Sequence, residues 1–287
     1  REIVTITTNC ILVLVLSVDP QAMWLARVAI GATIVSSPPE FVDEHGGAVR
    51  KAKEAVEHCL IHSFIDPESK GVLEIGARYG TSSCAISKVV TRNASVLVSV
   101  EADGTLFNAT ETNLRRNGCR NHLVHGVVGH HPMVKAKQRN GSPWTTKFDP
   151  VSSTDGGGAH KLSAEGDAMV PAYTPSALAS MYGATFDTMV VDCEGCFAAI
   201  LRDFPDTVRS VDTVMLEGDY GIGLQSQGYV DYNNITIAML SMGFMVSEQF
   251  FHPGLAQRPN RIPMIIFQKV ENAGNFRWKT GHRRACF

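Results

Sequence analysis

Residues 72–83 read Val72-Leu73-Glu74-Ile75-Gly76-Ala77-Arg78-Tyr79-Gly80-Thr81-Ser82-Ser83, and this stretch decides the fold. Its first four residues are mostly apolar and suit a strand that is buried on both faces. The two glycines let the backbone turn sharply and approach a ligand, and Thr81 or Ser82 can cap a following helix. The stretch therefore predicts a strand, a tight turn and a helix start, with Glu74 at the strand end where open α/β sheets bind ligands.

The turn has the pattern Glu-x-Gly-x-x-x-Gly, which differs from the Gly-x-Gly-x-x-Gly of dinucleotide-binding folds. A carboxylate beside the turn would repel a pyrophosphate. S-adenosylmethionine carries an ammonium, a sulfonium and a ribose but no phosphate, so it suits this turn better than NAD does. Glycine-rich turns also join strands to helices for purely structural reasons, so the turn alone leaves both interpretations open.

Composition limits the class of protein. The chain has 287 residues, of which 44% are hydrophobic, and this length suits one large α/β domain. Its formal net charge of −2 leaves no electrostatic footprint for nucleic acid, so no nucleic-acid partner is expected. The seven cysteines form no dense framework and fit a reducing compartment or occasional pairs. Four Asn-x-Ser/Thr triplets are short enough to arise by chance; they start at Asn93, Asn108, Asn140 and Asn234.

We expect an N-terminal extension over residues 1–45 and a main domain over residues 46–287. The apolar run Ile11–Val18 is shorter than the ~20 residues of a membrane span, so a buried strand or helix is expected. A residual signal or anchor that contacts a membrane is the alternative. We therefore favour a soluble intracellular or organellar protein and leave a processed N-terminus open. Residues 129–172 lack periodicity and predict a long loop or insertion that could govern substrate choice.

Expected strands and helices alternate along the chain. Strands are predicted at residues 72–75, 95–100, 122–128, 186–191, 211–216, 244–249 and 263–268. Helices are predicted at residues 48–64, from about 81, and at 103–117, 175–182 and 229–242. This alternation, with a hairpin at the end, predicts a doubly wound, mostly parallel sheet of the α/β class.

Carboxylates follow several expected strands, and they are Glu74, Glu101, Asp192, Glu194, Glu217 and Asp219. Because the carboxyl ends of parallel strands share one edge, we expect these side chains to face one crevice. Glu101 could accept hydrogen bonds from both ribose hydroxyls of an adenosine; alternatively, it caps the next helix with Asp103. Several carboxylates could converge on magnesium or calcium, but strand-end carboxylates also serve as caps, so a divalent cation is the weaker expectation.

Cys193 and Cys196 form a Cys-x-x-Cys pattern. No second pair has zinc-site spacing and no redox fold surrounds the pattern, so neither a zinc site nor a redox centre is expected.

Several segments resemble, in order, the FkbM-type methyltransferases, a branch of the S-adenosylmethionine-dependent class. The most discriminating is Asp192-Cys193-Glu194-Gly195 after an apolar strand. The others are Val72 to Ala77 with Gly80, Val98 to Glu101, Asn113 to Gly118, Phe186-Asp187, Val214 to Glu217 and Leu240 to Phe244. The resemblance spans about residues 70–270. It implies a Rossmann-like, class I methyltransferase sheet of seven strands with an antiparallel last strand.

The resemblance also implies residue roles. The cofactor-binding residues would be Glu74, Gly76, Ala77, Gly80, Thr81, Glu101 and Asp192. Asp192 and Glu194 would line the transfer site and be catalytic. The chain departs from the family at Arg78, where Asn is frequent, and at Phe197, where a second Glu often follows the Asp-x-Glu-Gly.

Methyl transfer is an in-line displacement that needs aligned reactants and, for a hydroxyl acceptor, a base. We expect Asp192 or Glu194 to be that base, with His125 and His252 as weaker candidates. The expected activity is O-methylation of a small molecule or glycan, with protein partners unspecified. Phe197 also motivates a second hypothesis, a methyltransferase-like subunit that binds or scaffolds without catalysis. An NAD-dependent dehydrogenase is the weakest hypothesis, because it predicts neither Glu74 nor the Asp-x-Glu-Gly.

Overall fold

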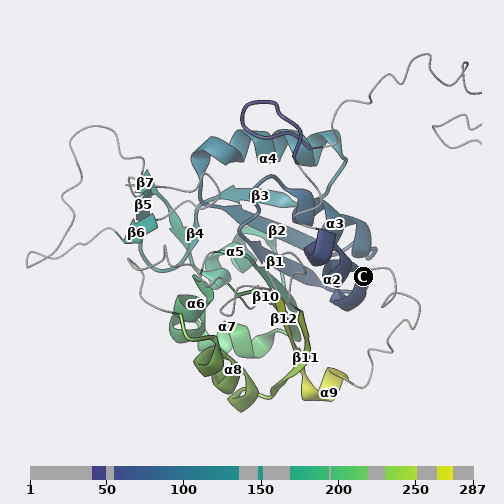
Figure 1. Cartoon of the computed structure of the whole chain (residues 1–287), viewed down its shortest axis with the longest axis vertical. Coiled ribbons are helices and arrows are strands. Elements are labelled where there is room, and N and C mark those ends of the chain that lie inside the picture. Colours follow the sequence, from purple (N-terminus) through teal and green to yellow (C-terminus); the bar gives the residue numbers. More distant parts are fainter. Residues whose placement is uncertain are drawn as a thin grey trace, which may run out of the picture. The chain divides into compact units, whose positions relative to one another are not determined.

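The computed structural model describes residues 41–49, 55–135, 148–150, 169–193, 195–218, 230–250 and 264–273. All of them belong to one compact unit, Glu40–Phe287. A seven-stranded sheet with the order β11-β12-β10-β9-β1-β2-β3 lies at its centre (Figure 1). Its strands are β1 (Gly71–Ile75), β2 (Val96–Glu101), β3 (His122–His125), β9 (Thr188–Val191), β10 (Thr213–Glu217), β11 (Phe244–Phe250) and β12 (Met264–Lys269).

The sheet is parallel from β3 through β2, β1 and β9 to β10, and β12 runs antiparallel to both of its neighbours, β10 and β11. The predicted fold class, a mostly parallel sheet of seven strands with an antiparallel last strand, is therefore confirmed. The chain leaves β1 toward β2 and β3, then returns to place β9 on the other side of β1. A topological switch point consequently lies between β1 and β9, where open α/β sheets bind their ligands.

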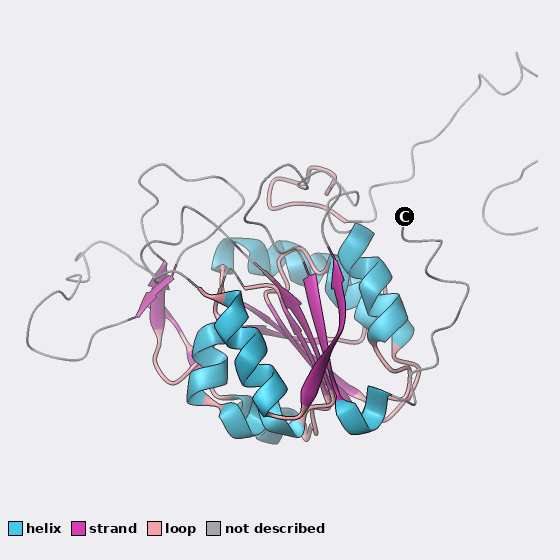
Figure 2. Ribbon diagram, turned by 60° about the horizontal axis from the view of Figure 1, so that its bottom comes forward, coloured by secondary structure: helices cyan, strands magenta, loops and turns pink. Residues whose placement is uncertain are grey.

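Helices cover both faces of the sheet (Figure 2). The described helices are α2 (Ala55–Phe64), α3 (Thr81–Val89), α4 (Gly104–Arg116), α5 (Pro175–Tyr182), α6 (Phe197–Asp203), α7 (Pro205–Ser210), α8 (Tyr232–Ser241) and α9 (Val270–Ala273). None of them is long and apolar enough to cross a membrane. Alternate strand residues enter different hydrophobic clusters: Val72 belongs to the cluster that includes residues of α2 and α3, whereas Leu73 belongs to the cluster that includes residues of α5, α6 and α8. The central strands β1, β9, β10 and β12 are thus buried on both faces, as their apolar runs predict.

The segment before α2 differs from the prediction. A helix was expected from Ala48, but Ala48 instead forms an antiparallel bridge with Val42, and the described helix starts at Ala55. Gly46 has a φ of 79° and the Asp43 side chain accepts hydrogen bonds from the backbone of His45 and Gly47. This local turn draws the chain out of the helical conformation, because an Asp side chain bonded to nearby backbone amides competes with helix formation.

Other elements also depart from the expected ones. The strand predicted at 122–128 is divided at Gly126, whose N–H donates to the Glu101 carbonyl, and β4 (Val127–Val128) pairs instead with β8 (Ala172–Tyr173). The described parts of the predicted long loop form a small antiparallel sheet of β5 (Met133–Lys135), β6 (Phe148–Pro150) and β7 (Met169–Val170). Helices α6 and α7 were not predicted, because elements of 7 and 6 residues are too short to show periodicity.

Candidate functional site

The glycine turn after β1 is held by backbone contacts that only glycine permits. Gly76 has a φ of 96°, and a Cβ there would lie 1.7 Å from the carbonyl oxygen of Asp192. The Asp192 N–H in turn donates to the Ile75 carbonyl at 3.0 Å. The ends of β1 and β9 therefore meet backbone to backbone at the switch point, which fixes Asp192 beside the turn.

The turn closes at Gly80, which has a φ of 78° and is the N-cap of α3. The prediction that Thr81 or Ser82 caps this helix is therefore wrong. Both lie buried in its first turn instead. Gly80 takes the cap position because the chain needs a left-handed residue to leave the turn, and a Cβ at Gly80 would lie 3.1 Å from Leu114 Cδ2.

Glu74 is 2% exposed, and its side chain points into the protein from the carboxyl end of β1. Its Oε2 accepts hydrogen bonds from the hydroxyls of Ser83 and Ser99, whereas its Oε1 is buried without a hydrogen-bond partner among the described residues. Burial raises the pKa of Glu74 to about 7; the carboxylates of Asp192 and Glu101 add to this rise, and the two hydroxyls oppose it. Glu74 therefore changes charge near neutral pH and retains a free acceptor atom.

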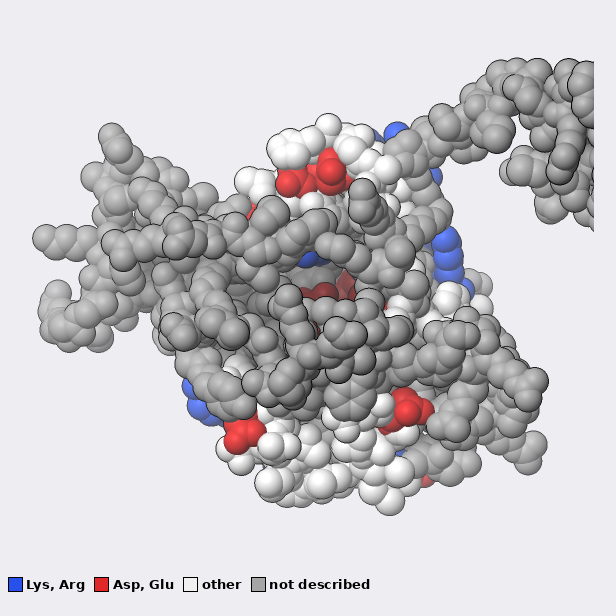
Figure 3. Space-filling view, in the orientation of Figure 1, with Lys and Arg blue, Asp and Glu red and all other residues white. Residues whose placement is uncertain are grey.

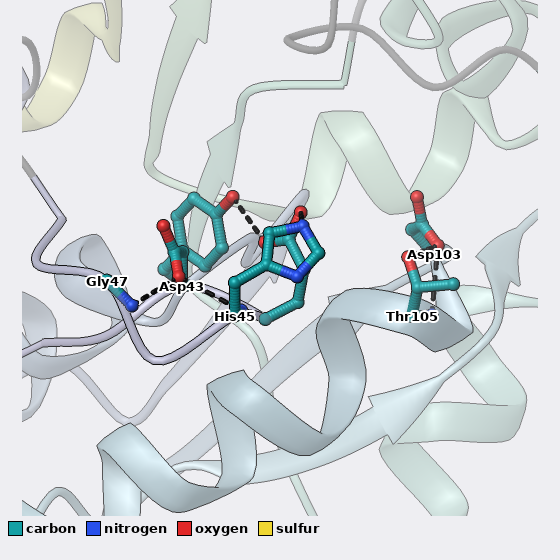
Figure 4. Close-up of polar contacts among 7 residues, drawn as sticks. Asp43, His45, Gly47, Asp103 and Thr105 are labelled. Carbon is teal, nitrogen blue, oxygen red and sulfur yellow. Dashed lines mark hydrogen bonds and ion pairs between the residues drawn. The ribbon is translucent and has the colours of Figure 1, made fainter.

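Glu101 is 7% exposed and lies at the end of β2, the strand next to β1. Its Oε2 accepts the Arg78 N–H at 2.6 Å, and its Oε1 accepts the Asp103 N–H at 2.7 Å. Burial raises the pKa of Glu101 despite these two amides. Asp103, not Glu101, caps α4, because its side chain accepts the Thr105 N–H at 3.0 Å (Figure 4).

Glu74, Glu101 and Asp192 come together at one edge of the sheet. Glu101 and Asp192 both act electrostatically on Glu74, and Asp192 is half-buried directly after β9. Figure 3 shows acidic side chains at the bottom of a hollow in the molecular surface. Three carboxyl groups are thus gathered where β1, β2 and β9 end.

The remaining predicted site residues are less closely connected with this edge. Glu217 ends β10, while Glu194, Asp219 and His252 lie outside the described residues. His125 ends β3 and contacts the Phe107 ring at 5.5 Å between ring centroids. Among the described residues, no group of three His, Cys, Asp or Glu side chains is arranged to hold a metal ion.

A short segment over residues 41–49, which we call the strap, lies against the glycine turn and was not predicted as part of the site. Asn113 is 0% exposed, and its carboxamide accepts the Val42 N–H at 3.0 Å and donates to the Val42 carbonyl at 2.8 Å. The same Nδ2 donates to the Tyr79 carbonyl at 2.9 Å, and the Tyr79 hydroxyl donates to Glu44 at 2.8 Å. Asn113 thereby joins the strap to the turn. The sequence signal for this role is an amide on the apolar side of α4.

Arg78 has a φ of 45° and is the one described residue other than glycine with a positive φ. Asn and Gly tolerate this left-handed conformation better than Arg does. One of the two positions at which the sequence departs from the FkbM pattern is therefore a position of backbone strain, within the turn itself.

The Cys-x-x-Cys pattern is a disulfide between Cys193 and Cys196. It spans the connection from Asp192 to α6, and the Cys196 N–H also donates to the Cys193 carbonyl at 3.3 Å. Gly195, inside this ring, has a φ of 96°. The loop after Asp192 is thus covalently closed.

Comparison with models of known protein families found no match, and comparison with curated protein sequences found none either. Similar solved structures include a proposed O-methyltransferase from Klebsiella pneumoniae, with 14% identity, 87% of this chain and 98% of that chain covered, and a TM-score of 0.46. The O-methyltransferase from Bacillus cereus in complex with SAH has 10% identity, coverage of 86% and 88%, and a TM-score of 0.43. The O-methyltransferase TomG from Streptomyces achromogenes, involved in tomaymycin synthesis and in complex with SAM, has 13% identity, coverage of 88% and 99%, and a TM-score of 0.42. At these identities and TM-scores, the similarities assign no activity to this chain.

Proposed function

We propose that this protein is an FkbM-type methyltransferase that uses S-adenosylmethionine to methylate a hydroxyl group on a small molecule or glycan. The observation that carries the proposal is the placement of Glu74, Glu101 and Asp192 around one glycine turn, at the switch point between β1 and β9. Carboxyl groups gathered at this point favour a ligand that has cationic and hydrogen-bond-donating groups and lacks phosphate.

The residues at this edge fit the chemical groups of S-adenosylmethionine. Glu74 Oε1 is a buried acceptor without a partner among the described residues and suits a cationic or N–H group. Each oxygen of Glu101 accepts one backbone amide and retains a lone pair for a ribose hydroxyl. We assign cofactor binding to Glu74, Gly76, Ala77, Gly80, Thr81, Glu101 and Asp192.

When bound, S-adenosylmethionine would supply an electrophilic methyl group. The protein's part is to hold the acceptor hydroxyl in line with that group and to take up its proton. We assign the proton acceptor to Asp192 or Glu194. Asp192 suits this role because its backbone is fixed against the turn while its side chain is only half-buried.

Phe197 favours the second candidate function, a methyltransferase-like subunit that binds without catalysis. Its side chain is 1% exposed and packs in the main core beneath the loop after β9. An apolar residue there supplies no second carboxylate to the transfer site. Binding of the cofactor without turnover on any acceptor would support this candidate.

Calorimetric titration with S-adenosylmethionine and with NAD tests cofactor binding. Formation of S-adenosylhomocysteine in the presence of hydroxylated acceptors tests methyl transfer. We expect binding of S-adenosylmethionine only. D192N should still bind it but turn over at least ~100-fold more slowly, the scale of a lost general base. D206N is the matched control, because Asp206 is exposed on α7 and pairs with Arg209. Binding of NAD, or of neither ligand, would overturn the proposal.

A further inference from the structure

One disulfide joins two helical regions of this chain, and further cysteines are also bonded. Cys84, in α3, is bonded to Cys119, which lies beyond the end of α4 at a sequence separation of 35. Cys84 is 1% exposed and packs with Phe41 and Leu114. Cys193 and Cys196 form a second bond, and Cys59 is also disulfide-bonded. A buried bond between two helical regions is part of the folded structure and is distinct from the exposed bonds of redox sensors.

Such bonds form and persist in oxidising compartments and are rare in the reducing cytosol. Each bond forms when two thiols transfer two electrons and two protons to an oxidised dithiol carrier. The cysteine count left a reducing compartment and occasional pairs both open, and the bonded cysteines favour the second interpretation, with folding in an oxidising compartment. In a eukaryotic secretory pathway this environment coincides with glycosylation of exposed Asn-x-Ser/Thr triplets.

The triplet Asn93-Ala94-Ser95 lies on an exposed turn between α3 and β2. The Ser95 N–H donates to the Arg92 carbonyl at 3.1 Å, which closes the turn with Asn93 and Ala94 at its tip. Asn93 is exposed, so a glycan attached to its carboxamide would extend into solvent without displacing a packed side chain.

Asn93 lies at the opposite edge of the sheet from the other two described triplets. Asn93 precedes β2 and therefore lies at the amino edge, opposite the edge that holds Glu101 and Asp192. Asn108 is exposed in the first half of α4, which begins at the carboxyl end of β2. Asn234 is exposed in the first turn of α8. Helix α8 ends at the amino edge, where β11 begins, so the first turn of this helix lies toward the carboxyl edge. A glycan at Asn93 would leave the candidate site open.

We propose that this protein folds in an oxidising secretory compartment and carries an N-linked glycan on Asn93. The Asn93 amide nitrogen would form a bond to the anomeric carbon of a polyprenyl-diphosphate-linked oligosaccharide. The bond from that carbon to the diphosphate breaks, the polyprenyl diphosphate leaves, and the amide loses one proton. This inference is independent of the proposed methyl transfer.

The decisive experiment uses the protein isolated from the cells that make it. Peptide N-glycosidase in isotope-labelled water converts a glycosylated Asn into labelled Asp, which mass spectrometry locates. We expect label at residue 93 and, before reduction, a linked peptide pair containing Cys84 and Cys119. Unmodified Asn93, or label only at Asn108 or Asn234, would overturn the assignment of the glycan. Free thiols at Cys84 and Cys119 would overturn the assignment of the compartment.

A second experiment tests the acceptor triplet itself, with the chain directed into the secretory pathway of cultured eukaryotic cells. S95A removes the hydroxyl that the triplet requires, whereas S95T keeps one. We expect S95A and N93Q to lose the glycosidase-sensitive mobility shift and S95T to retain it. S95A also removes the hydrogen bond from the Ser95 hydroxyl to the Ser69 carbonyl, whereas N93Q keeps it. A mobility shift that is lost in N93Q therefore cannot be attributed to the loss of that hydrogen bond. A shift that persists in both N93Q and S95A would contradict the proposal.

Discussion

At the scale of single residues, the buried carboxyl group of Glu74 makes stability depend on pH. Its pKa is about 7 in the folded protein, against a usual value of 4.5, so the folded state binds more protons between these values. Stability is therefore full below about pH 4.5 and falls as pH rises to about 7. We expect the free energy of unfolding of the wild-type protein to fall by on the order of 3 kcal/mol over this pH range, and we expect E74Q to remove that fall. Urea unfolding of the wild-type protein and E74Q below and above this pH range measures the difference. An equal pH dependence in the two proteins would refute the assignment of this loss to Glu74.

Arg78 is a second residue whose conformation has an energetic consequence. Its φ of 45° places a side chain in the left-handed region, where glycine has no Cβ penalty. R78G should be more stable than R78A by about 1 kcal/mol, because both remove the guanidinium but only glycine relieves the backbone. Denaturant midpoints of the two variants give this difference. R78A also removes the guanidinium that lies 5.2 Å from the centroid of the Tyr79 ring and acts electrostatically on Glu101, so R78A against wild type reports the sum of the side-chain interactions.

At the scale of elements, Asn113 is the link between α4, the strap and the glycine turn. N113L would leave the Val42 N–H, the Val42 carbonyl and the Tyr79 carbonyl without this side-chain partner. We expect a loss of about 1–3 kcal/mol and faster amide hydrogen exchange over residues 41–49. N108A, at an exposed position on the same helix, is the matched control and should change neither quantity. Unchanged exchange in N113L would show that the strap is held by other contacts.

The two described disulfides should contribute unequally to stability. In the chain-entropy account, the loop closed by Cys84 and Cys119, with a separation of 35, contributes about 4 kcal/mol. The loop closed by Cys193 and Cys196, with a separation of 3, contributes about 2 kcal/mol. Unfolding of C84A/C119A and C193A/C196A tests this order. A larger loss in the second pair would mean that the bond beside Asp192 supports more than its own short loop.

At the scale of the whole molecule, sequence patterns predicted the sheet well. The apolar runs of β1, β2 and β9 were recognisable because these strands are buried on both faces, which leaves few polar positions within each run. The final antiparallel pair, β11 and β12, was predicted from two expected strands joined as a hairpin and from the FkbM resemblance. The secondary-structure prediction failed at short elements such as α6 and α7. It also failed at the strap, where a turn around Asp43 replaced the expected helix start.

The candidate site was predictable in its chemistry and only partly in its geometry. Acidic residues after strands predicted that Glu74, Glu101 and Asp192 share one edge, since parallel strands end together. The sequence did not reveal that Glu101 is held by the Arg78 and Asp103 amides or that Glu74 is fully enclosed. Those facts depend on how α3, α4 and the turn pack around the strand ends.

The sequence by itself determined the strand-and-helix alternation, the glycine turn and the presence of acids at strand ends, because these features depend on near neighbours in the chain. Only the tertiary structure decided that Gly76 meets Asp192, that Asn113 binds Val42, and that Cys84 pairs with Cys119. Each of these contacts joins residues that are far apart in sequence. Such contacts form only when the sheet order and helix packing bring their backbones together, and local propensity carries no information about that arrangement.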